Sequence, residues 1–186
     1  LEAGPFQPRR NFDEAELDRL AESIRTQGLL QPILVRPVPG SVDRFHIIAG
    51  ERRWRAAQRA RLHEVAVVVR DLTDGDALQI AIIENVQRQD LTALEEGEGY
   101  RRLMAEFGLT QDDVARAVGK SRSHIANTLR LMDLPESVRE MLQRGELSAG
   151  HGRALLACRD PLAAAREVVR RGLNVRQTEA LARAGD

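Results

Sequence analysis

The sequence is poor in cysteine and in aromatic side chains. Cys158 is the only cysteine, which excludes a disulfide within the chain and a cysteine-based zinc site. Aromatic residues make up 3% of the chain, too few for the row of exposed rings that stacks single-stranded nucleic acid. No apolar run approaches the roughly 20 residues of a membrane-spanning helix, and nothing resembles a signal peptide. These absences predict a soluble protein with no membrane partner, in a reducing, cytoplasmic setting.

Net positive charge is also lacking, because 28 basic residues balance 28 acidic ones. The totals therefore give no argument for a nucleic-acid partner, and the local distribution of charge matters more. Residues 114–132 contain no acid and four basic side chains, Arg116, Lys120, Arg122 and Arg130. Such a segment in an otherwise neutral chain indicates one local binding face.

The hydrophobic periodicity favours two domains within the 186 residues. The first part mixes helices with strands, which we expect at residues 32–36, at 45–48 and, buried, at 65–69, before a helix at 74–86. The second part shows only helical patterns, expected at residues 94–107, 110–118, 121–131, 138–142, 149–158, 161–169 and 175–184. We predict an α+β domain over residues 1–90 and an all-α domain over residues 91–186, with the boundary near residues 89–92. Because the chain starts at Leu1 rather than at methionine, we expect it to be a piece of a longer protein.

Residues 46–62 combine a strand pattern, a glycine and the start of a basic helix. The strand runs into Gly50, and the helix that follows carries five arginines and a single acid, Glu51. The first N–H groups of a helix have no intrahelical acceptor, and a preceding glycine lets an anion approach them closely. This pattern predicts a phosphate site. The spacing of Arg52, Arg53 and Arg55 alone is equally consistent with a solvated basic face of the helix.

Residues 110–132 have the pattern of a helix-turn-helix. Thr110 is expected to cap the first helix, Gly119 to make the turn, and Ser121 to cap the second helix. In the second helix Ile125, Leu129 and Met132 are spaced to pack inward, which leaves an outward face of Arg122, Ser123, Asn127, Thr128 and Arg130. Those side chains suit base edges and phosphates. The alternative is an ordinary helical hairpin with a solvated basic face.

With these residues in hand, the chain resembles the ParB family of chromosome-partitioning proteins over essentially its whole length. Four motifs carry the resemblance: Gln7-Pro8-Arg9-Arg10, the Gly50-Glu51-Arg52-Arg53 turn, Glu84-Asn85-Val86-Gln87-Arg88, and residues 119–135 followed by Gly150-His151. The resemblance implies a ParB/sulfiredoxin-like α+β domain before the helix-turn-helix domain. The chain departs from the family pattern at Arg61, where glycine is frequent, at Ala93, where proline is frequent, and at Gly97 and Gly152, where alanine is common.

The resemblance implies that the first domain binds CTP with Mg²⁺ and hydrolyses it. The residues implied for CTP are Gln7, Arg9, Gly50, Glu51, Arg52, Arg53, Asn85 and Arg88. Glu51 would position or activate water, Arg52 would offset developing charge, and Glu84 with Asn85 would serve Mg²⁺. From the residues alone, the polar end of a helix is the better interpretation of Glu84, Asn85 and Gln87.

The resemblance also implies recognition of double-stranded DNA containing a palindromic, centromere-like parS site. The residues implied are Gln111, Lys120, Ser121, Arg122, Asn127, Thr128, Gly150 and His151. Nucleotide and parS together would close two subunits into a clamp dimer that slides on nucleoid DNA. From the resemblance we expect two further family segments to lie outside this chain: the one that contacts a ParA-type ATPase and the C-terminal dimerisation domain.

Three hypotheses follow: a CTP-gated DNA clamp, which could be a nucleoid-occlusion paralogue with another DNA site; a non-enzymatic helix-turn-helix regulator; and a phosphotransferase or redox enzyme that does not bind DNA. The helix-turn-helix counts against the last, and the set of Glu51, Glu84 and Asn85 counts against the second.

Overall fold

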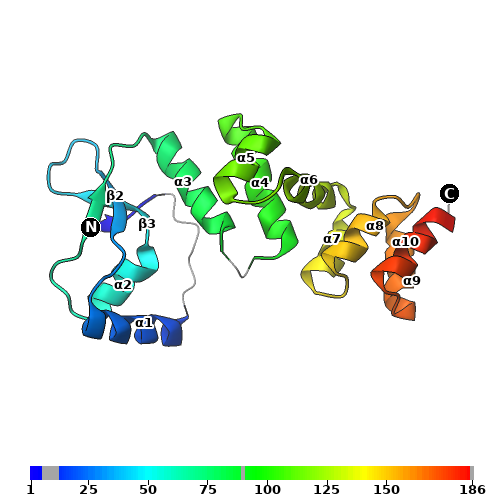
Figure 1. The fold of residues 1–186 in the computed structure, drawn as a ribbon, viewed down its shortest axis with the longest axis horizontal. Helices are drawn as coiled ribbons and strands as arrows, with labels where there is room; N and C mark the ends of the chain where they lie inside the picture. Colours follow the sequence, from blue (N-terminus) through cyan, green and yellow to red (C-terminus); the bar gives the residue numbers. More distant parts are fainter. Residues whose placement is uncertain (6–12, 89–90, 185–186) are drawn as a thin grey trace. The chain divides into compact units, whose positions relative to one another are not determined.

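The computed structural model describes residues 1–5, 13–88 and 91–184. The chain forms two compact units, Leu1–Asn85 and Val86–Asp186 (Figure 1). The motif Gln7-Pro8-Arg9-Arg10 and residues 89–90 of the expected boundary lie outside the described residues. In the described part of the chain, no helix combines the length and the apolar character needed to cross a membrane.

The first unit is built on a mixed four-stranded sheet. Its strands are β1 (Glu2–Ala3), β2 (Ile33–Pro37), β3 (Phe45–Ala49) and β4 (Val67–Val69), in the order β1-β3-β2-β4. β2 and β3 form the antiparallel hairpin that the two strand patterns predicted, whereas β1 pairs parallel to β3 and β4 parallel to β2. The sequence did not predict β1, because two residues are too few to show an alternating pattern.

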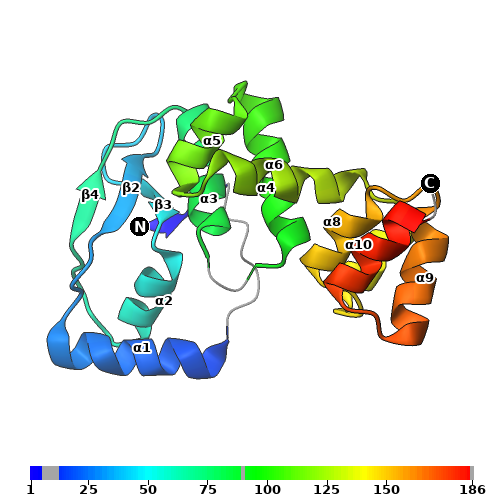
Figure 2. The same ribbon diagram turned by 45° about the vertical axis from the view of Figure 1, so that its right-hand side comes forward.

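One helix packs on this sheet, and a second helix packs on the first. Helix α2 (Glu51–Arg59) packs Trp54 against the sheet cluster of Ile33, Val35 and Ile47. On its other side, Ala56 and Ala60 pack against Leu17, Ala21 and Ile24 of α1 (Glu14–Gln27), so α2 lies between the sheet and α1 (Figure 2). Asp13 caps α1 by accepting hydrogen bonds from the backbone N–H groups of Ala15 and Glu16.

The expectation of a buried strand at residues 65–69 is wrong. The strand is shorter, and Val67, Val68 and Val69 are 37%, 40% and 49% exposed. The physical reason is position in the sheet: among the described strands β4 lies at the edge, with β2 as its one neighbour. A run of valines indicates a β-strand, but it does not predict whether that strand lies at the edge or in the centre of the sheet.

Helix α3 (Asp74–Val86) is tied to the sheet at its start. The Arg36 side chain of β2 is 4% exposed, pairs with Asp74 and donates a hydrogen bond to the Leu72 carbonyl at 3.2 Å. A buried guanidinium with a charged partner is costly to disturb, so this contact fixes where α3 begins.

The second unit is helical throughout its described residues. It contains α4 (Ala93–Phe107), α5 (Gln111–Val118), α6 (Arg122–Arg130), the 3₁₀ turn η1 (Leu131–Asp133), α7 (Glu136–Gln143), α8 (Ala149–Leu155), α9 (Pro161–Arg171) and α10 (Val175–Ala184). A core of aliphatic side chains from α4, η1, α7, α8 and α9 holds it together, including Leu131, Val138, Leu155 and Val168. The expected all-α character of this part is confirmed.

The end of α2 explains one departure from the family pattern. Arg61 has φ +59°, and the hydrogen bonds from Leu62 N–H to the Ala57 carbonyl and from Arg61 N–H to the Gln58 carbonyl complete a Schellman motif. The left-handed conformation crowds the Cβ atom of every residue except glycine.

We therefore expect Arg61→Gly to raise the free energy of unfolding by about 1 kcal/mol, because it removes the crowded Cβ atom. Urea denaturation measures the change. Arg61→Ala is the matched control, since it removes the charge and keeps Cβ, and it should be close to neutral. Equal stability of the two variants would contradict the explanation.

Candidate functional site

The turn before α2 presents backbone in a form suited to an anion. Gly50 is the N-cap of α2, has φ +100°, and has no side chain to occupy the first N–H groups of the helix. The Arg53 guanidinium folds over it, and a Cβ atom at position 50 would lie 3.0 Å from Arg53 Nη2. A phosphate bound at this turn could accept hydrogen bonds from the first N–H groups of α2 and from the Arg53 guanidinium.

Most arginines of α2 already have partners inside the first unit. Arg52 pairs with Glu16 at 2.9 Å, and Arg59 pairs with Glu14 and Asp18. Arg53 donates hydrogen bonds to the Gln31 and Pro32 carbonyls at 3.0 and 2.9 Å. The basic face of α2 is thus neither a bare phosphate cradle nor a simple solvated surface, because its outer arginines fasten α2 to α1.

Glu51 is the buried acid of the turn. Its side chain is 6% exposed, and Oε1 accepts hydrogen bonds from Arg55 Nε at 2.9 Å and Nη2 at 2.6 Å. The other oxygen, Oε2, is buried and has no hydrogen-bond partner among the described residues. Because buried carboxylate oxygens almost always accept a hydrogen bond, Oε2 is suited to receive a water molecule or a metal-bound group.

The acidic and amide residues expected at the metal lie in the last turn of α3. Glu84 is exposed and Asn85 is half-buried, and Arg88 follows the helix, also half-buried. Within the described ranges, no group of three or more histidine, cysteine or acidic side chains could hold a metal by itself. Mg²⁺ commonly takes one or two protein carboxylates and completes its shell with phosphates and water. One carboxylate beside one amide fits that mode of binding.

The helix-turn-helix geometry follows the pattern predicted for residues 110–132. Thr110 caps α5 in a capping box with Asp113, and the hydrogen bond from the Thr110 hydroxyl lowers the pKa of Asp113 to about 2. Gly119 has φ +71° and makes the turn, and Ser121 Oγ accepts from the His124 N–H at 3.1 Å to cap α6. Both short helices therefore begin at a side-chain cap, as the sequence pattern predicted.

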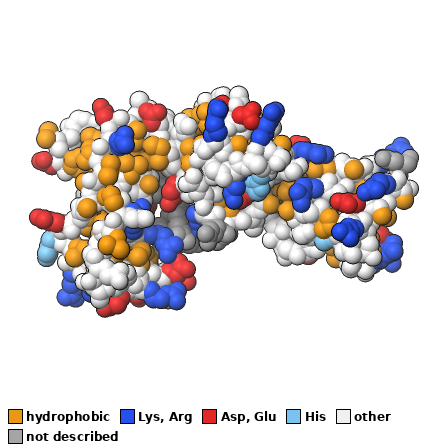
Figure 3. All heavy atoms as spheres, viewed as in Figure 1, with side chains coloured by type: hydrophobic (Ala, Val, Ile, Leu, Met, Phe, Trp, Pro, Cys, Tyr) orange, Lys and Arg blue, Asp and Glu red, His pale blue; other side chains and the backbone are white. Residues whose placement is uncertain are grey.

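The outer face of this element is basic and polar. Lys120, Ser121 and Arg122 are exposed at the start of α6, and Arg122 Nε lies 3.6 Å from Asp112 Oδ1. Asn127 is half-buried on the same helix. Gln111 is half-buried at the start of α5, where it lines a pocket of about 380 Å³ together with Arg101 and Arg130. Lys and Arg side chains gather over α5 and α6, with acidic side chains among them (Figure 3).

The prediction that Thr128 faces outward is wrong. Its side chain is 5% exposed and lies in the buried stripe of α6 with Ile125. The spacing places residue 128 three positions after Ile125, which is the inward face of a helix. Leu129, expected to pack inward, is instead partly exposed.

Gly150 and His151 have clear roles inside the second unit. A Cβ atom at Gly150 would lie 2.9 Å from Val175 Cγ2, so glycine allows α8 and α10 to approach closely. His151 Nδ1 accepts from the Ser148 N–H at 3.1 Å, and Nε2 lies 3.0 Å from the Leu173 carbonyl. A ring that accepts at Nδ1 carries its proton at Nε2, so both nitrogens are engaged within the fold.

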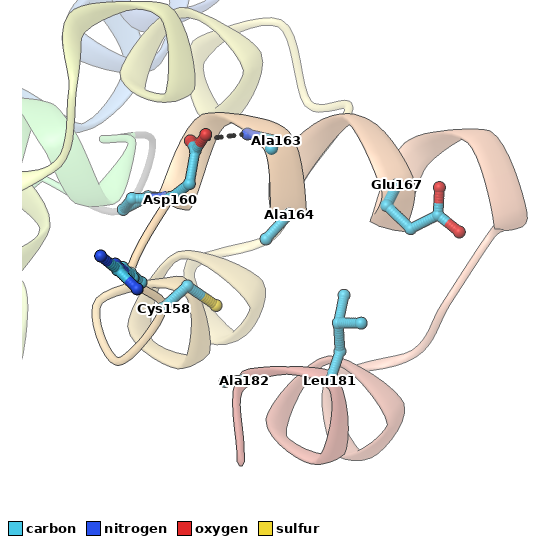
Figure 4. A pocket seen from close by; sticks show the side chains of 9 residues that line it. Cys158, Asp160, Ala163, Ala164, Glu167, Leu181 and Ala182 are labelled. Carbon is cyan, nitrogen blue, oxygen red and sulfur yellow. Dashed lines mark hydrogen bonds between the residues drawn. The ribbon is translucent and has the colours of Figure 1, made fainter. Parts of the chain in front are cut away.

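A larger pocket lies between α9 and α10, away from every predicted site residue. It measures about 670 Å³, and its walls include Cys158, Asp160 and Leu181 (Figure 4). Asp160 caps α9 by accepting from the Ala163 N–H at 3.0 Å. Sequence reasoning gave no signal for this pocket, because short polar and alanine side chains form most of its wall.

Two domain models match the chain. Residues 1–86 match the ParB N-terminal domain, and residues 89–185 match the ParB HTH domain. The chromosome-partitioning protein ParB of Caulobacter vibrioides is 55% identical over 98% of this chain, and the chain spans 60% of that relative's length.

Solved structures give the same relationship. The C-terminally truncated chromosome-partitioning protein ParB from Caulobacter crescentus, complexed to the centromeric parS site, matches with a TM-score of 0.90. It is 53% identical, with 98% of this chain and 95% of that chain covered. The same truncated protein complexed with CTP-γ-S is 54% identical over 90% of this chain and 93% of that one, with a TM-score of 0.44, too low to say anything about shape. With domain models matched from residue 1 to residue 86 and again from 89 to 185, the chain belongs to the ParB family.

Proposed function

We propose that this chain is the nucleotide-binding and DNA-binding part of a chromosome-partitioning protein, and that it acts as a CTP-dependent clamp on parS DNA. The observation that carries the proposal is the likeness, at a TM-score of 0.90 over 98% of the chain, to a relative complexed to parS. The domains assigned are residues 1–90 for CTP and residues 91–186 for DNA. A palindromic site pairs with a two-fold protein, so two subunits form the clamp. A ParA-type ATPase would bind a segment outside this chain.

The nucleotide half rests on the turn at Gly50. Family membership supports CTP as the ligand, and the first N–H groups of α2 with Arg53 suit its phosphates. Arg52 must exchange its bond to Glu16 for phosphate, and because both side chains are 42% exposed, that exchange costs little, about 1 kcal/mol or less. Gln7, Arg9, Asn85 and Arg88 complete the proposed CTP contacts.

The catalytic proposal rests on the two unequal oxygens of Glu51. Arg55 holds Oε1, which fixes the carboxylate and leaves the buried Oε2 to orient water toward the terminal phosphate. Arg52 would stabilise the charge that develops there. Glu84 and Asn85 would hold Mg²⁺, which neutralises phosphate charge when bound.

The DNA half rests on the exposed start of α6. Arg122 is placed to read a base edge in the major groove, and Gln111, Lys120, Ser121 and Asn127 to contact backbone or neighbouring bases. Both ring nitrogens of His151 are engaged and its backbone N–H donates to Ser148 Oγ at 3.3 Å, so for this pair we assign the DNA contact to the backbone of Gly150. Thr128 is withdrawn as a base-reading residue, because it is buried.

A second candidate is a DNA-binding regulator that binds nucleotide without hydrolysing it. The internal pairing of Arg52 and Arg59 favours this reading, because those charges already serve the packing of α2 on α1. The two candidate functions differ in whether the chain hydrolyses CTP, so a measurement of phosphate release from CTP distinguishes them.

We expect the chain to bind CTP in preference to ATP, GTP and UTP, and to release phosphate from CTP faster when parS DNA is present. Glu51→Gln should lower the rate of phosphate release at least about 100-fold, because the amide cannot activate water, and change CTP affinity only a few-fold. Glu64→Gln, an exposed acid of the same unit, is the control and should behave like the unaltered chain. Equal affinity for the four nucleotides would contradict the CTP assignment. An unchanged rate in Glu51→Gln would remove Glu51 from the mechanism.

Arg122→Ala should weaken binding to parS by about 1–3 kcal/mol and reduce discrimination against a scrambled duplex, because a base contact is lost. Fluorescence anisotropy at one fixed salt concentration measures both affinities. Arg170→Ala on α9 is the matched control, since it removes an arginine that is already paired with Glu167. An equal loss on the two duplexes would make Arg122 a backbone contact.

Thr128→Val should leave discrimination between parS and scrambled DNA unchanged, because the side chain is buried in the second unit and does not reach a groove. Its effect should be confined to the melting temperature. A loss of discrimination without a change in melting temperature would restore Thr128 to the DNA interface.

A further inference from the structure

A polar contact fastens the recognition helix α6 to α4. The Glu96 carboxylate of α4 lies with Oε2 at 2.9 Å from His124 Nε2, in the first turn of α6. The Glu96 side chain is 16% exposed and that of His124 is 40% exposed, so the contact is partly shielded from water. A shielded hydrogen bond to a charged group is worth more than one on an open surface.

Tyr100 supports the same carboxylate. It is fully buried, its hydroxyl lies 3.5 Å from Glu96 Oε2, and its ring meets the His124 ring edge-on with centroids 6.3 Å apart. Burial, together with the nearby Glu96, raises the pKa of Tyr100 to about 12, so the hydroxyl stays protonated and donates a hydrogen bond to Glu96. Since a carboxylate only accepts, His124 must carry a hydrogen on Nε2. Tyr100 and His124 are therefore both hydrogen-bond donors, and the Glu96 carboxylate accepts from each.

The backbone of α4 and that of α6 approach closely one turn further along. A Cβ atom at Gly97 would lie 3.3 Å from the Thr128 carbonyl oxygen and 3.1 Å from Met132 Sδ. His124 and Thr128 are one turn apart and face the same neighbour. Helix α6 is thus held against α4 at two successive turns, by packing at Thr128 and by hydrogen bonding at His124.

We infer that Glu96 and His124 are positioning residues for DNA recognition, which fix the rotation of α6 and the place of its first turn. This inference rests on the proposed binding of parS. The residues that would meet DNA, Lys120, Ser121 and Arg122, lie within four positions of His124. A small rotation of α6 would move all three relative to the groove, and sequence readout depends on such geometry more than phosphate attraction does.

The direction of the change in parS affinity on removal of Glu96 distinguishes a positioning role from a purely electrostatic one. Glu96 is an acid one helix away from the DNA-reading face, and removal of a negative charge should strengthen the attraction of phosphates. A positioning role predicts the reverse, namely weaker binding to parS when Glu96 is removed. Glu98 provides a matched control, because it is an exposed acid of α4 that pairs only with Arg101 among its described contacts.

The experiment measures affinities for a parS duplex and a scrambled duplex of equal length, by anisotropy at one salt concentration. We expect Glu96→Ala and His124→Ala each to weaken parS binding roughly tenfold and to change scrambled-duplex binding less than about twofold. The double variant should be no weaker than the single variants, because both remove the same contact. Glu98→Ala should leave parS binding unchanged or slightly tighter. Thermal melting establishes that each variant is folded.

Two variants of similar side-chain size test the inference if an alanine variant does not fold. His124→Gln can still donate to Glu96 and should keep parS affinity within about threefold, whereas His124→Leu cannot donate and should lose roughly tenfold. Unchanged or tighter parS binding in Glu96→Ala, or equal losses on both duplexes, would overturn the positioning role. If the unaltered chain itself did not prefer parS over the scrambled duplex, the proposed function would fail instead.

Discussion

The first unit of this chain, for which we propose CTP binding, depends on one buried carboxylate at the start of a helix. Glu51 lies where the sheet, α2 and the Gly50 turn meet, and an isolated buried charge there would be destabilising by several kcal/mol. Arg55, one turn later on the same helix, offsets that cost through two hydrogen bonds to a single oxygen. The asymmetry is informative, because a carboxylate that served only the fold would use both oxygens. In the proposed mechanism, this buried oxygen, which has no partner among the described residues, is the atom that would orient water.

The arginines of α2 show why charge in a sequence does not identify its partner. Five arginines within one short segment suggest a polyanion, yet Arg52 and Arg59 bind acids of α1, and Arg53 binds two backbone carbonyls. The acids involved lie about 40 positions earlier in the chain, beyond the reach of any local pattern. Exposed pairs of this type contribute little to stability, so they can be exchanged for phosphate at low cost. Partial occupation by internal partners is therefore compatible with a binding site and with its regulation.

Local physics made much of the fold predictable. The caps at Thr110 and Ser121 and the turn at Gly119 stand where short-range hydrogen bonding requires them, and the helix-turn-helix followed from these signals. Features that depend on distant neighbours were missed or misplaced, namely the two-residue β1 and the exposed edge strand β4. The ties of His151 to Leu173 and of His124 to Glu96 belong to the same class. The inward side of Thr128 is a different kind of error, because its spacing of three from Ile125 was already visible in the sequence. Residue patterns identified which side chains carry chemistry, while tertiary packing decided which of them remain available for a ligand.

The glycines that depart from the family pattern are explained by packing. Glycine within a helix costs about 1 kcal/mol relative to alanine. At Gly152, however, an added Cβ atom would lie 2.9 Å from Leu131 Cδ2 and 3.2 Å from Leu142 Cδ1, inside the core of the second unit. The leucines occupy the space that an alanine would need, so the loss of helix propensity is offset by their dispersion contacts. Gly97 follows the same logic against Met132, whose flexible side chain fills the gap that the missing methyl leaves. Because Gly97 is also where α4 meets α6, this local choice sets how closely α6, the proposed recognition helix, packs against α4.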